Sequence, residues 1–343
     1  MNTSWIRVSV AISVVGVAFA GALAQLDSSS AFADDSSQAG SRAAPLVAGP
    51  NRPANVPEGY LITPFGYFHP SCVQRLAKGE SVLPDGRVQH ADGTVAGKAA
   101  VCNYPRYTPK GILMSAAPGR TQPGNNSARA NTSAEINGWI EQESIVADTP
   151  TKSYGAMLSI WVVPPQPRAK DGQILYIFPG FEDIDNTESI LQPVLQWSAG
   201  QWAIASWNCC LNNVAGESPL VNVRPGDIIY GSISSTCRAG TVYCPTWNVF
   251  SLDITTGQST ILAATPSEGQ QFNWAFAGAL EPYYVVSCDD YPPNRHIAFG
   301  NLTLDQNLRP IVNPKWGGSV NTTQTPQCNY GIAAKPHEIT LHY

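Results

Sequence analysis

Charged residues are scarce in this sequence. Only 13% of its 343 residues are Asp, Glu, Lys or Arg, and the formal net charge is −5. The few basic residues form no cluster that could follow a phosphate backbone, which is how most proteins bind nucleic acid. The composition therefore excludes nucleic acid as an expected partner.

Several catalytic motifs are missing as well. His337-Glu338 has no second histidine four positions on, and the five histidines are scattered, so no zinc site is expected. The sequence has no GxSxG elbow around a nucleophilic serine, and it has no Walker or Rossmann phosphate loop. We therefore expect neither a metal nor a cofactor, and no nucleotide-dependent reaction.

Long apolar runs are also missing, apart from one at the start of the chain. Arg7 precedes an uncharged run from Val8 to Ala24, which is typical of a secretory signal peptide. Small residues offer cleavage after Ala24 or after Ala33, and we take residues 1–33 as the signal. An uncleaved membrane anchor is the alternative. The expected location is extracellular, with no membrane contact after signal removal.

The eight cysteines are an even number in a chain expected to leave the reducing cytosol, which favours disulfides over metal ligation. Proximity suggests Cys72 with Cys102 and Cys237 with Cys244, although eight cysteines allow about 105 connectivities. We expect the adjacent Cys209 and Cys210 to bond to two different partners.

Composition divides the rest of the chain into four segments. Residues 34–57 are rich in Ser, Ala, Gly and Pro, and predict a disordered lead. Residues 58–117 bring aromatics and Asp-Gly turn signals, and predict a small β-rich unit that could be a propeptide. Residues 118–134 have the composition of a linker, and residues 135–343 form the main domain.

Short β-branched and aromatic runs recur in the main domain between Gly, Pro and Asn clusters, with no sustained helical period. This spacing predicts an all-β, two-sheet antiparallel sandwich. The expected strands are Gly155–Val163, Gln173–Phe178, Trp202–Trp207, Asp227–Ser235, Thr246–Ile254, Ser259–Ala264, Tyr283–Val286 and His296–Leu304.

Polar residues interrupt two of the apolar segments. Gln192 and Gln196 are four positions apart, so an extended strand places them on one face. Glu281 is the only charged residue between Glu268 and Asp289, and burial among aromatics would raise its pKa, as a general acid or base requires. The alternative is structural: a satisfied carboxylate and a buried amide at a strand end.

The segment from residue 178 to 197 resembles the acid glutamic peptidases called eqolisins, whose pattern is aromatic-x-Gly-x-acid, then Ile-Leu-Gln, then Trp. Further similar segments follow at the Gly-Asp turn, at a Thr-Thr-Gly hairpin and at a strand carrying a glutamate. The matching residues are Phe178, Gly180, Glu182, Ile190-Leu191-Gln192, Trp197, Pro225-Gly226-Asp227, Thr255-Thr256-Gly257 and Ala279-Leu280-Glu281.

The resemblance implies a concanavalin-like sandwich and a secreted acid endopeptidase that hydrolyses polypeptides as a monomer. By position, Glu281 would activate the attacking water, and the Gln192 amide would stabilise the oxyanion. Phe178, Glu182 and Trp197 would line the substrate cleft. Neprosin-type peptidases, a related group, use two glutamates, and Glu182 with Glu281 would be that arrangement here.

The chain departs from the eqolisin pattern at several positions. Ser206 stands where the family has a glutamate, and Tyr284 replaces its second glutamate after the catalytic one. Two other function classes stay open on this sandwich. One is a non-catalytic, lectin-like carbohydrate-binding protein, which the nine Trp and thirteen Tyr would suit. The other is a glycoside hydrolase using Glu182 and Glu281.

Overall fold

The computed structural model describes residues 46–49, 51–83, 85, 87–97, 102–115, 138–148, 152–185, 189–210, 213–267, 269–306 and 309–343. The expected signal peptide, the start of the expected lead and the expected linker at 118–134 lie outside these residues. Residues 43–343 belong to one compact unit. None of the described segments forms a helix long and apolar enough to cross a membrane.

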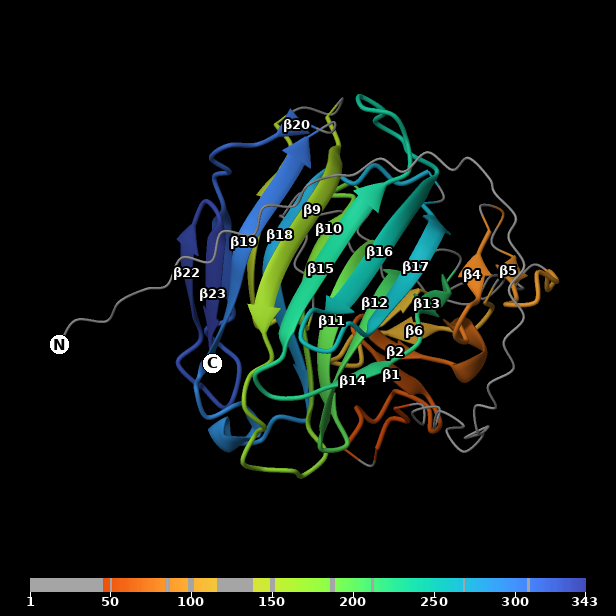
Figure 1. Ribbon diagram of the computed structural model, residues 1–343. Coiled ribbons are helices and arrows are strands. Elements are labelled where there is room, and N and C mark those ends of the chain that lie inside the picture. Colours follow the sequence, from red (N-terminus) through yellow and green to blue (C-terminus); the bar gives the residue numbers. More distant parts are fainter. Residues whose placement is uncertain are drawn as a thin grey trace, which may run out of the picture. The chain divides into compact units, whose positions relative to one another are not determined.

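Two large sheets pack face to face, which confirms the predicted all-β sandwich (Figure 1). Across the nine-stranded sheet the order is β21 (Gly317–Val320), β8 (Glu141–Val146), β18 (Trp274–Tyr283), β10 (Ile174–Glu182), β11 (Ile190–Ser198), β12 (Gln201–Cys209), β13 (Ala215–Glu217) and β3 (Val73–Arg75), and β14 (Val221–Val223) also pairs with β12.

The eight-stranded sheet lies in front of it in Figure 1. Its order is β17 (Ser259–Pro266), β16 (Thr246–Asp253), β15 (Ile228–Ser235), β9 (Tyr154–Val162), β19 (His296–Gln306), β23 (Glu338–His342) and β22 (Gly331–Lys335), and β20 (Arg309–Pro310) pairs with β19. Most predicted strands match these bounds within a few residues.

The described residues from 46 to 115, here called the N-terminal part, form smaller elements that are orange in Figure 1. A four-stranded sheet has the order β1 (Leu61–Thr63), β2 (Gly66–Phe68), β6 (Arg106–Tyr107) and β7 (Leu113–Ser115), and a hairpin joins β4 (Ser81–Val82) to β5 (Val88–Gln89). One further strand, β3, belongs to the nine-stranded sheet of the sandwich, where it pairs in parallel with β13.

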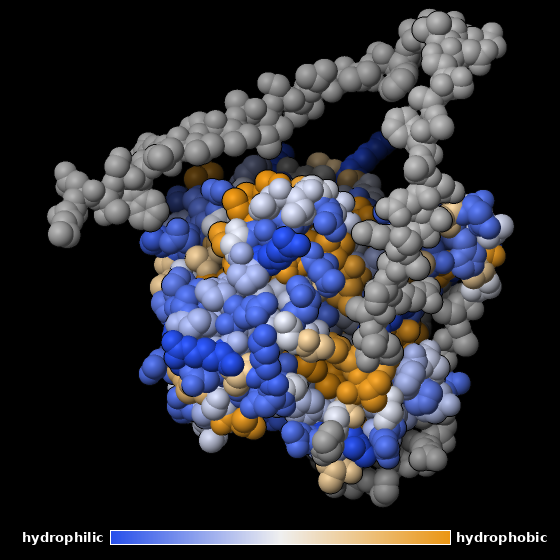
Figure 2. All heavy atoms as spheres, turned by 60° about the horizontal axis from the view of Figure 1, so that its bottom comes forward, coloured by the Kyte–Doolittle hydropathy of each residue, from blue (hydrophilic) through white to orange (hydrophobic). Residues whose placement is uncertain are grey.

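The main core lies between the two large sheets, because alternate side chains of each strand point inward. Its bulkiest members include Trp161, Trp202 and Trp247, all at most 1% exposed. On the side shown in Figure 2, hydrophilic residues dominate the surface, and apolar residues gather in patches near its middle. Most large apolar side chains of the described residues are therefore inside.

Four disulfides join all eight cysteines. Cys72–Cys102 and Cys237–Cys244 form as predicted, and Cys288 bonds to Cys328. The expectation for the adjacent pair was wrong, because Cys209 bonds to Cys210. The other six cysteines are satisfied by one another, so the adjacent pair has no other partner. The first bridge lies within the N-terminal part and the other three within the sandwich.

Two predicted boundaries are also corrected. The disordered lead does not extend to residue 57, because Val56 is buried and the Ala48 amide donates to the Tyr60 carbonyl at 2.7 Å. Of the expected strand Tyr283–Val286, only Tyr283 belongs to a strand, as the last residue of β18. Tyr284 has a φ of 59°, in the left-handed region, which terminates the extended backbone at Tyr283.

Candidate active site

The central strands of the nine-stranded sheet are buried on both faces. Every residue of β10 is buried, and so are nearly all those of β11, β12 and β18. One face meets the main core, and the other, here called the covered face, packs against the N-terminal part. The shared apolar cluster there includes Tyr60, Phe65, Tyr67, Phe68, Tyr176, Phe178, Trp207 and Phe276.

Polar side chains of the three central strands β10, β11 and β18 lie on this covered face. Gln192 and Gln196 on β11 alternate with core residues, as their spacing predicts, and Glu182 and Glu281 project from β10 and β18. None is more than 2% exposed. Both carboxylate oxygens of Glu182 and both polar atoms of Gln192 have no hydrogen-bond partner within the described part of the chain. Burying such groups without partners is costly, which marks the place as a candidate site.

Glu182 and Gln192 are close in the register. Glu182 pairs with Ile190 on β11, and Gln192 is two positions further along the same face. Side chains in this diagonal relation have Cα atoms about 7–8 Å apart, within reach of long side chains. Gly180 on β10 lies opposite Gln192, and the Ile190 side chain packs over it, since a Cβ at Gly180 would lie 3.2 Å from Ile190 Cδ1. A carboxylate and an amide are therefore near neighbours on the covered face.

Charge and burial act together on Glu182. Its pKa is raised well above its usual range, first because burial desolvates the carboxylate, and then because Asp183 and Glu281 repel its charge. Arg106 opposes this shift. Arg106 comes from β6 of the N-terminal part, is 2% exposed, and places its guanidinium 5.6 Å from the ring centre of Phe65. A cation of the N-terminal part therefore acts electrostatically on the candidate carboxylate.

Glu281 has a different environment, made of hydroxyl and indole groups. Its Oε1 lies 3.2 Å from the Tyr283 hydroxyl. Burial raises its pKa to about 8, while hydrogen bonds from Tyr283 and Trp139 act in the opposite direction. The same Tyr283 hydroxyl accepts from the Gly66 amide and lies 2.9 Å from the Thr63 carbonyl. The β1–β2 turn of the N-terminal part is thus tied to the neighbour of Glu281.

The two members of the expected dyad share the covered face but do not touch. Glu281 pairs with Tyr176, whereas Leu191, next to Gln192, pairs with Phe181. Gln192 therefore lies opposite Gly180, four residues along β10 from Tyr176, which corresponds to about 13 Å, so a single water cannot bridge the two side chains. In the strand register, Glu182 is the glutamate nearest to Gln192.

Of the expected cleft residues, Phe178 and Glu182 lie on the covered face, and Trp197 does not. Phe178 packs edge-on against Trp139, with ring centres 5.1 Å apart. Trp197 belongs to the main core and packs against Trp202. The expectation for Trp197 was wrong because it is five positions from Gln192, and an odd spacing along a strand reverses the face.

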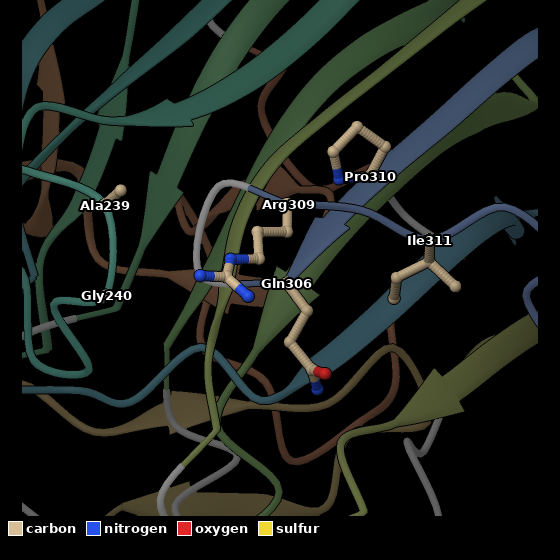
Figure 3. Close-up of a pocket in the computed structure, with 6 residues that line it drawn as sticks. All are labelled: Ala239, Gly240, Gln306, Arg309, Pro310 and Ile311. Atoms are coloured by element: carbon tan, nitrogen blue, oxygen red, sulfur yellow. The ribbon is translucent and has the colours of Figure 1, made fainter.

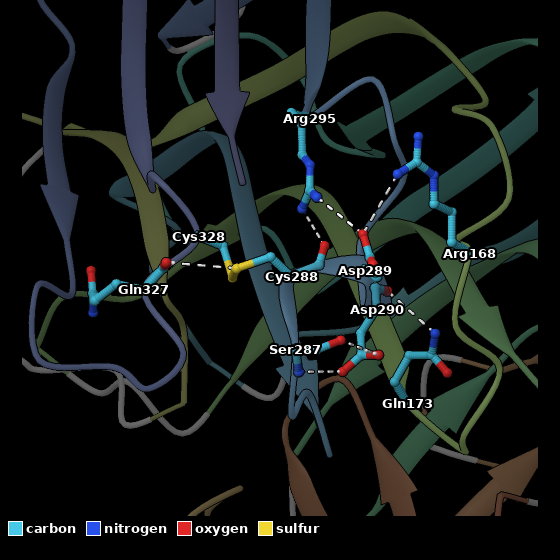
Figure 4. Close-up of polar contacts among 9 residues, drawn as sticks. All are labelled: Arg168, Gln173, Ser287, Cys288, Asp289, Asp290, Arg295, Gln327 and Cys328. Atoms are coloured by element: carbon cyan, nitrogen blue, oxygen red, sulfur yellow. Dashed lines mark hydrogen bonds and ion pairs between the residues drawn. A yellow bond between two sulfur atoms is a disulfide. The ribbon is translucent and has the colours of Figure 1, made fainter.

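The turn after β18 fixes the strand that carries Glu281. The Asp290 carboxylate accepts from the Val286 amide at 2.6 Å and from the Ser287 amide at 2.8 Å. The Gln173 side chain, just before β10, donates to the Asp290 carbonyl at 3.3 Å (Figure 4). This network holds the end of β18 beside the start of β10, where Tyr176 and Glu281 pair.

The described residues enclose cavities at two places that bear on the choice of site. One of about 170 Å³ lies at the seam between the N-terminal part and the sandwich and is lined by Tyr67, Tyr283 and Tyr284, next to Glu281. Another of about 390 Å³ opens on the surface near β20, lined by Gln306 and Arg309 among others (Figure 3). The second contains no carboxylate and contributes no candidate catalytic residue.

Arg106, Trp139 and Tyr283 are site residues that the sequence did not single out. Arg106 and Trp139 reach the site only through long-range packing, and no local motif marks them. Tyr283 had one usable signal, because it is two positions from Glu281 and therefore on the same strand face. Across the described ranges, no group of three or more His, Cys, Asp or Glu side chains is placed to hold a metal ion.

Comparisons with known proteins complete the description. No family model matches the sequence, and no curated protein matches it. Similar solved structures include scytalido-glutamic peptidase with a peptide-based transition-state analogue, at 12% identity and a TM-score of 0.45 over 60% of this chain and 98% of that one.

Two more similar structures are peptidases. SCP-B, a member of the eqolisin family in a complex with the tripeptide Ala-Ile-His, has 12% identity and a TM-score of 0.42, covering 60% of this chain and 98% of that one. Aspergilloglutamic peptidase from Aspergillus niger has 16% identity and a TM-score of 0.34, covering 50% and 98%.

Proposed function

We propose that this chain is a secreted endopeptidase of the glutamic type, present here in a closed form, and that Gln192 and Glu182 are its catalytic pair. The observation that carries the proposal is their diagonal placement on the covered face, fully buried and without hydrogen-bond partners among the described residues. Polar groups that are buried without hydrogen-bond partners are expected at a site where a bound substrate and a water supply the missing hydrogen bonds.

Hydrolysis then follows general acid–base chemistry. Ionised Glu182 takes a proton from a water as the water oxygen attacks the carbonyl carbon of the peptide bond. The Gln192 amide nitrogen donates a hydrogen bond to the oxyanion of the tetrahedral intermediate. Glu182 then gives the proton to the leaving nitrogen, and the C–N bond breaks. Glu281, about 13 Å along the strand direction from Gln192, is a further acid of the face and the alternative base.

The N-terminal part would keep this site closed. The Arg106 charge acts on Glu182, and the Gly66 and Thr63 backbone groups bind Tyr283 beside Glu281. No polypeptide substrate reaches the pair while these contacts persist, which is the behaviour of a propeptide. The four disulfides support export to an oxidising compartment.

The test uses the full chain with a site-specific protease sequence inserted within residues 118–134, folded intact and then cut. Cleavage of denatured casein between pH 3 and 8 is measured before and after the cut. We expect activity only after the cut, with Glu182→Gln lowering kcat at least about 100-fold and Gln192→Ala by a similar factor.

Two variants on the same face serve as controls. Gln196→Ala removes an amide of the same chemistry four positions away and should keep kcat within about threefold. Glu281→Gln identifies the base: if it abolishes cleavage while Glu182→Gln does not, the pair is assigned incorrectly. A cut and separated wild-type chain that cleaves nothing at any pH rejects the proposed function.

A further inference from the structure

The edge strand of the nine-stranded sheet, β3, comes from the N-terminal part. β3 pairs in parallel with β13, with Val73 opposite Ala215 and Arg75 opposite Glu217. The Leu76 amide donates to the Glu217 carbonyl at 2.9 Å, which extends the pairing beyond β3. Without β3, the backbone groups of β13 would form an open sheet edge, which readily accepts another extended chain.

The side chains at this edge add charge recognition to the backbone pairing. Arg75 Nε lies 2.6 Å from Glu217 Oε2, and the two side chains are 29% and 2% exposed. The carboxylate is therefore almost completely covered, and its partner cation is partly exposed. Burial raises the pKa of Glu217 to about 7, and the Arg75 charge opposes that shift.

The same edge lies in line with the candidate catalytic pair. Trp207 on β12 pairs with Glu217 on one side and with Gln192 on the other. Directly paired residues point to the same face, so Glu217 and Gln192 both lie on the covered face, two strand spacings or about 10 Å apart. A chain bound at the β13 edge is thus held next to the proposed reaction centre.

We infer that the β13 edge with Glu217 is a docking site for an extended segment of the polypeptide substrate that carries arginine or lysine, and that β3 with Arg75 occupies this site in the closed form. The inference rests on the proposed function for the identity of the occupant. The occupant's chemistry comes from β3 itself: an extended backbone for the strand edge and a guanidinium for the buried carboxylate. Other parts of the substrate supply the scissile bond.

Binding tests this directly, without any need for hydrolysis. The protein is the full chain cut within residues 118–134 and separated from its N-terminal part. The probe is a fluorescent ten-residue peptide containing Val-Gln-Arg-Leu, the sequence of residues 73–76. Fluorescence anisotropy compares it with a peptide in which norleucine replaces the arginine. We expect the arginine peptide to bind roughly tenfold more tightly.

Variants of Glu217 distinguish charge recognition from nonspecific peptide binding. Glu217→Gln should remove the preference, and Glu217→Lys should reverse it in favour of a peptide with glutamate at the same position. Glu338→Gln, at an exposed carboxylate on β23, is the matched control and should keep the preference. Equal binding of the arginine and norleucine peptides to the wild-type chain overturns the inference, and so does a preference that survives in Glu217→Gln.

Two further outcomes are informative. If the N-terminal part stays bound after the cut, the measurement is made on the cut Arg75→Glu chain, where two carboxylates face each other and free the edge. Failure of the arginine peptide to bind there also overturns the inference. Preferential binding by a chain that cleaves nothing supports the docking site and rejects the proposed function, whereas cleavage whose KM is indifferent to arginine does the reverse.

Discussion

The two outer faces of the sandwich differ sharply, although both belong to large, mainly antiparallel sheets. Along β9, β15 and β16, buried residues alternate with half-buried or exposed ones, as expected when one face meets solvent. Along β10, β11 and β18, burial is almost continuous. Polar side chains such as Ser232 and Asn248 cost little on the solvent face, whereas Glu182 and Gln192 lose their hydration on the covered face.

This difference teaches where to look for function. The solvent face carries ordinary surface polarity, which needs no explanation. The covered face carries acids and amides that an apolar core would replace at a gain in stability, and a fold keeps such groups when they serve another purpose.

A lysine placed on each face gives the largest expected contrast. Val194, which is 0% exposed on the covered face, should tolerate Val194→Lys poorly, with a loss of more than about 4 kcal/mol in the free energy of unfolding. Thr303→Lys on exposed β19 should stay within about 0.5 kcal/mol. Urea unfolding measures both. Similar losses in the free energy of unfolding at the two sites would mean that solvent reaches the covered face.

Replacing one aromatic residue by alanine at the covered face and one at the solvent face should give the next largest difference. Phe68 of the N-terminal part is 1% exposed and packs onto the covered face, so Phe68→Ala should cost about 3–5 kcal/mol. Phe250 is half-buried on the outer face of the eight-stranded sheet, and Phe250→Ala should cost about 1 kcal/mol. If Phe68→Ala costs no more than Phe250→Ala in denaturant unfolding, the N-terminal part does not complete a core.

The buried acids predict a stability that falls as pH rises. Burial raises the pKa of Glu281 and of Glu141 to about 8, and that of Glu217 to about 7. The folded chain therefore holds more protons than the unfolded chain between about pH 4.5 and 8. This stabilisation is complete below the unfolded pKa and is lost on going up to pH 8.

Thermal unfolding of the wild-type chain should accordingly show a higher Tm at pH 5 than at pH 9, with a difference on the order of 3 kcal/mol in the free energy of unfolding. Glu281→Gln should reduce the pH dependence, because it removes one of the groups that gain protons on folding. A Tm that rises with pH would show that these carboxylates are ionised and stabilised in the folded state.

Two ion pairs give the smallest contrast. Arg75→Gln leaves the buried Glu217 carboxylate without its cation and should cost about 2 kcal/mol, and a second change, Glu217→Gln, should recover part of that loss. Lys335→Gln breaks an exposed pair with Glu338 and should cost less than about 0.5 kcal/mol. If Arg75→Gln and Lys335→Gln lower the free energy of unfolding equally, the Arg75–Glu217 pair is as exposed to solvent as the Lys335–Glu338 pair.

Local sequence patterns predict most of the sandwich. The β-branched runs match the strands because each strand is a short, local feature, and the even spacing of Gln192 and Gln196 gives their shared face. The cleft role of Trp197 comes from the resemblance alone, and the same rule argues against it, since an odd spacing from Gln192 excludes a shared face.

The relation between Gln192 and Glu281 could not be predicted from spacing. It depends on the pairing of β10 with β18, which are about a hundred residues apart and whose register shifts near Phe178 and Gly180. Arg106 could not be foreseen for the same reason, because it reaches Glu182 only after the N-terminal part has packed onto the sheet. The cysteine pairs close in sequence were predictable, and the Cys209–Cys210 bond was not.

The placement of the disulfides has a consequence for how long the closed form lasts. Cys72–Cys102 lies within the N-terminal part, and the other three bridges lie within the sandwich, so no covalent cross-link joins the two. One backbone cut between them turns an intramolecular contact into an association between two molecules, and the effective concentration that a tether provides is lost. Separation of the two parts would then depend on dilution: a high protein concentration favours the associated form, and a low concentration favours the separated one.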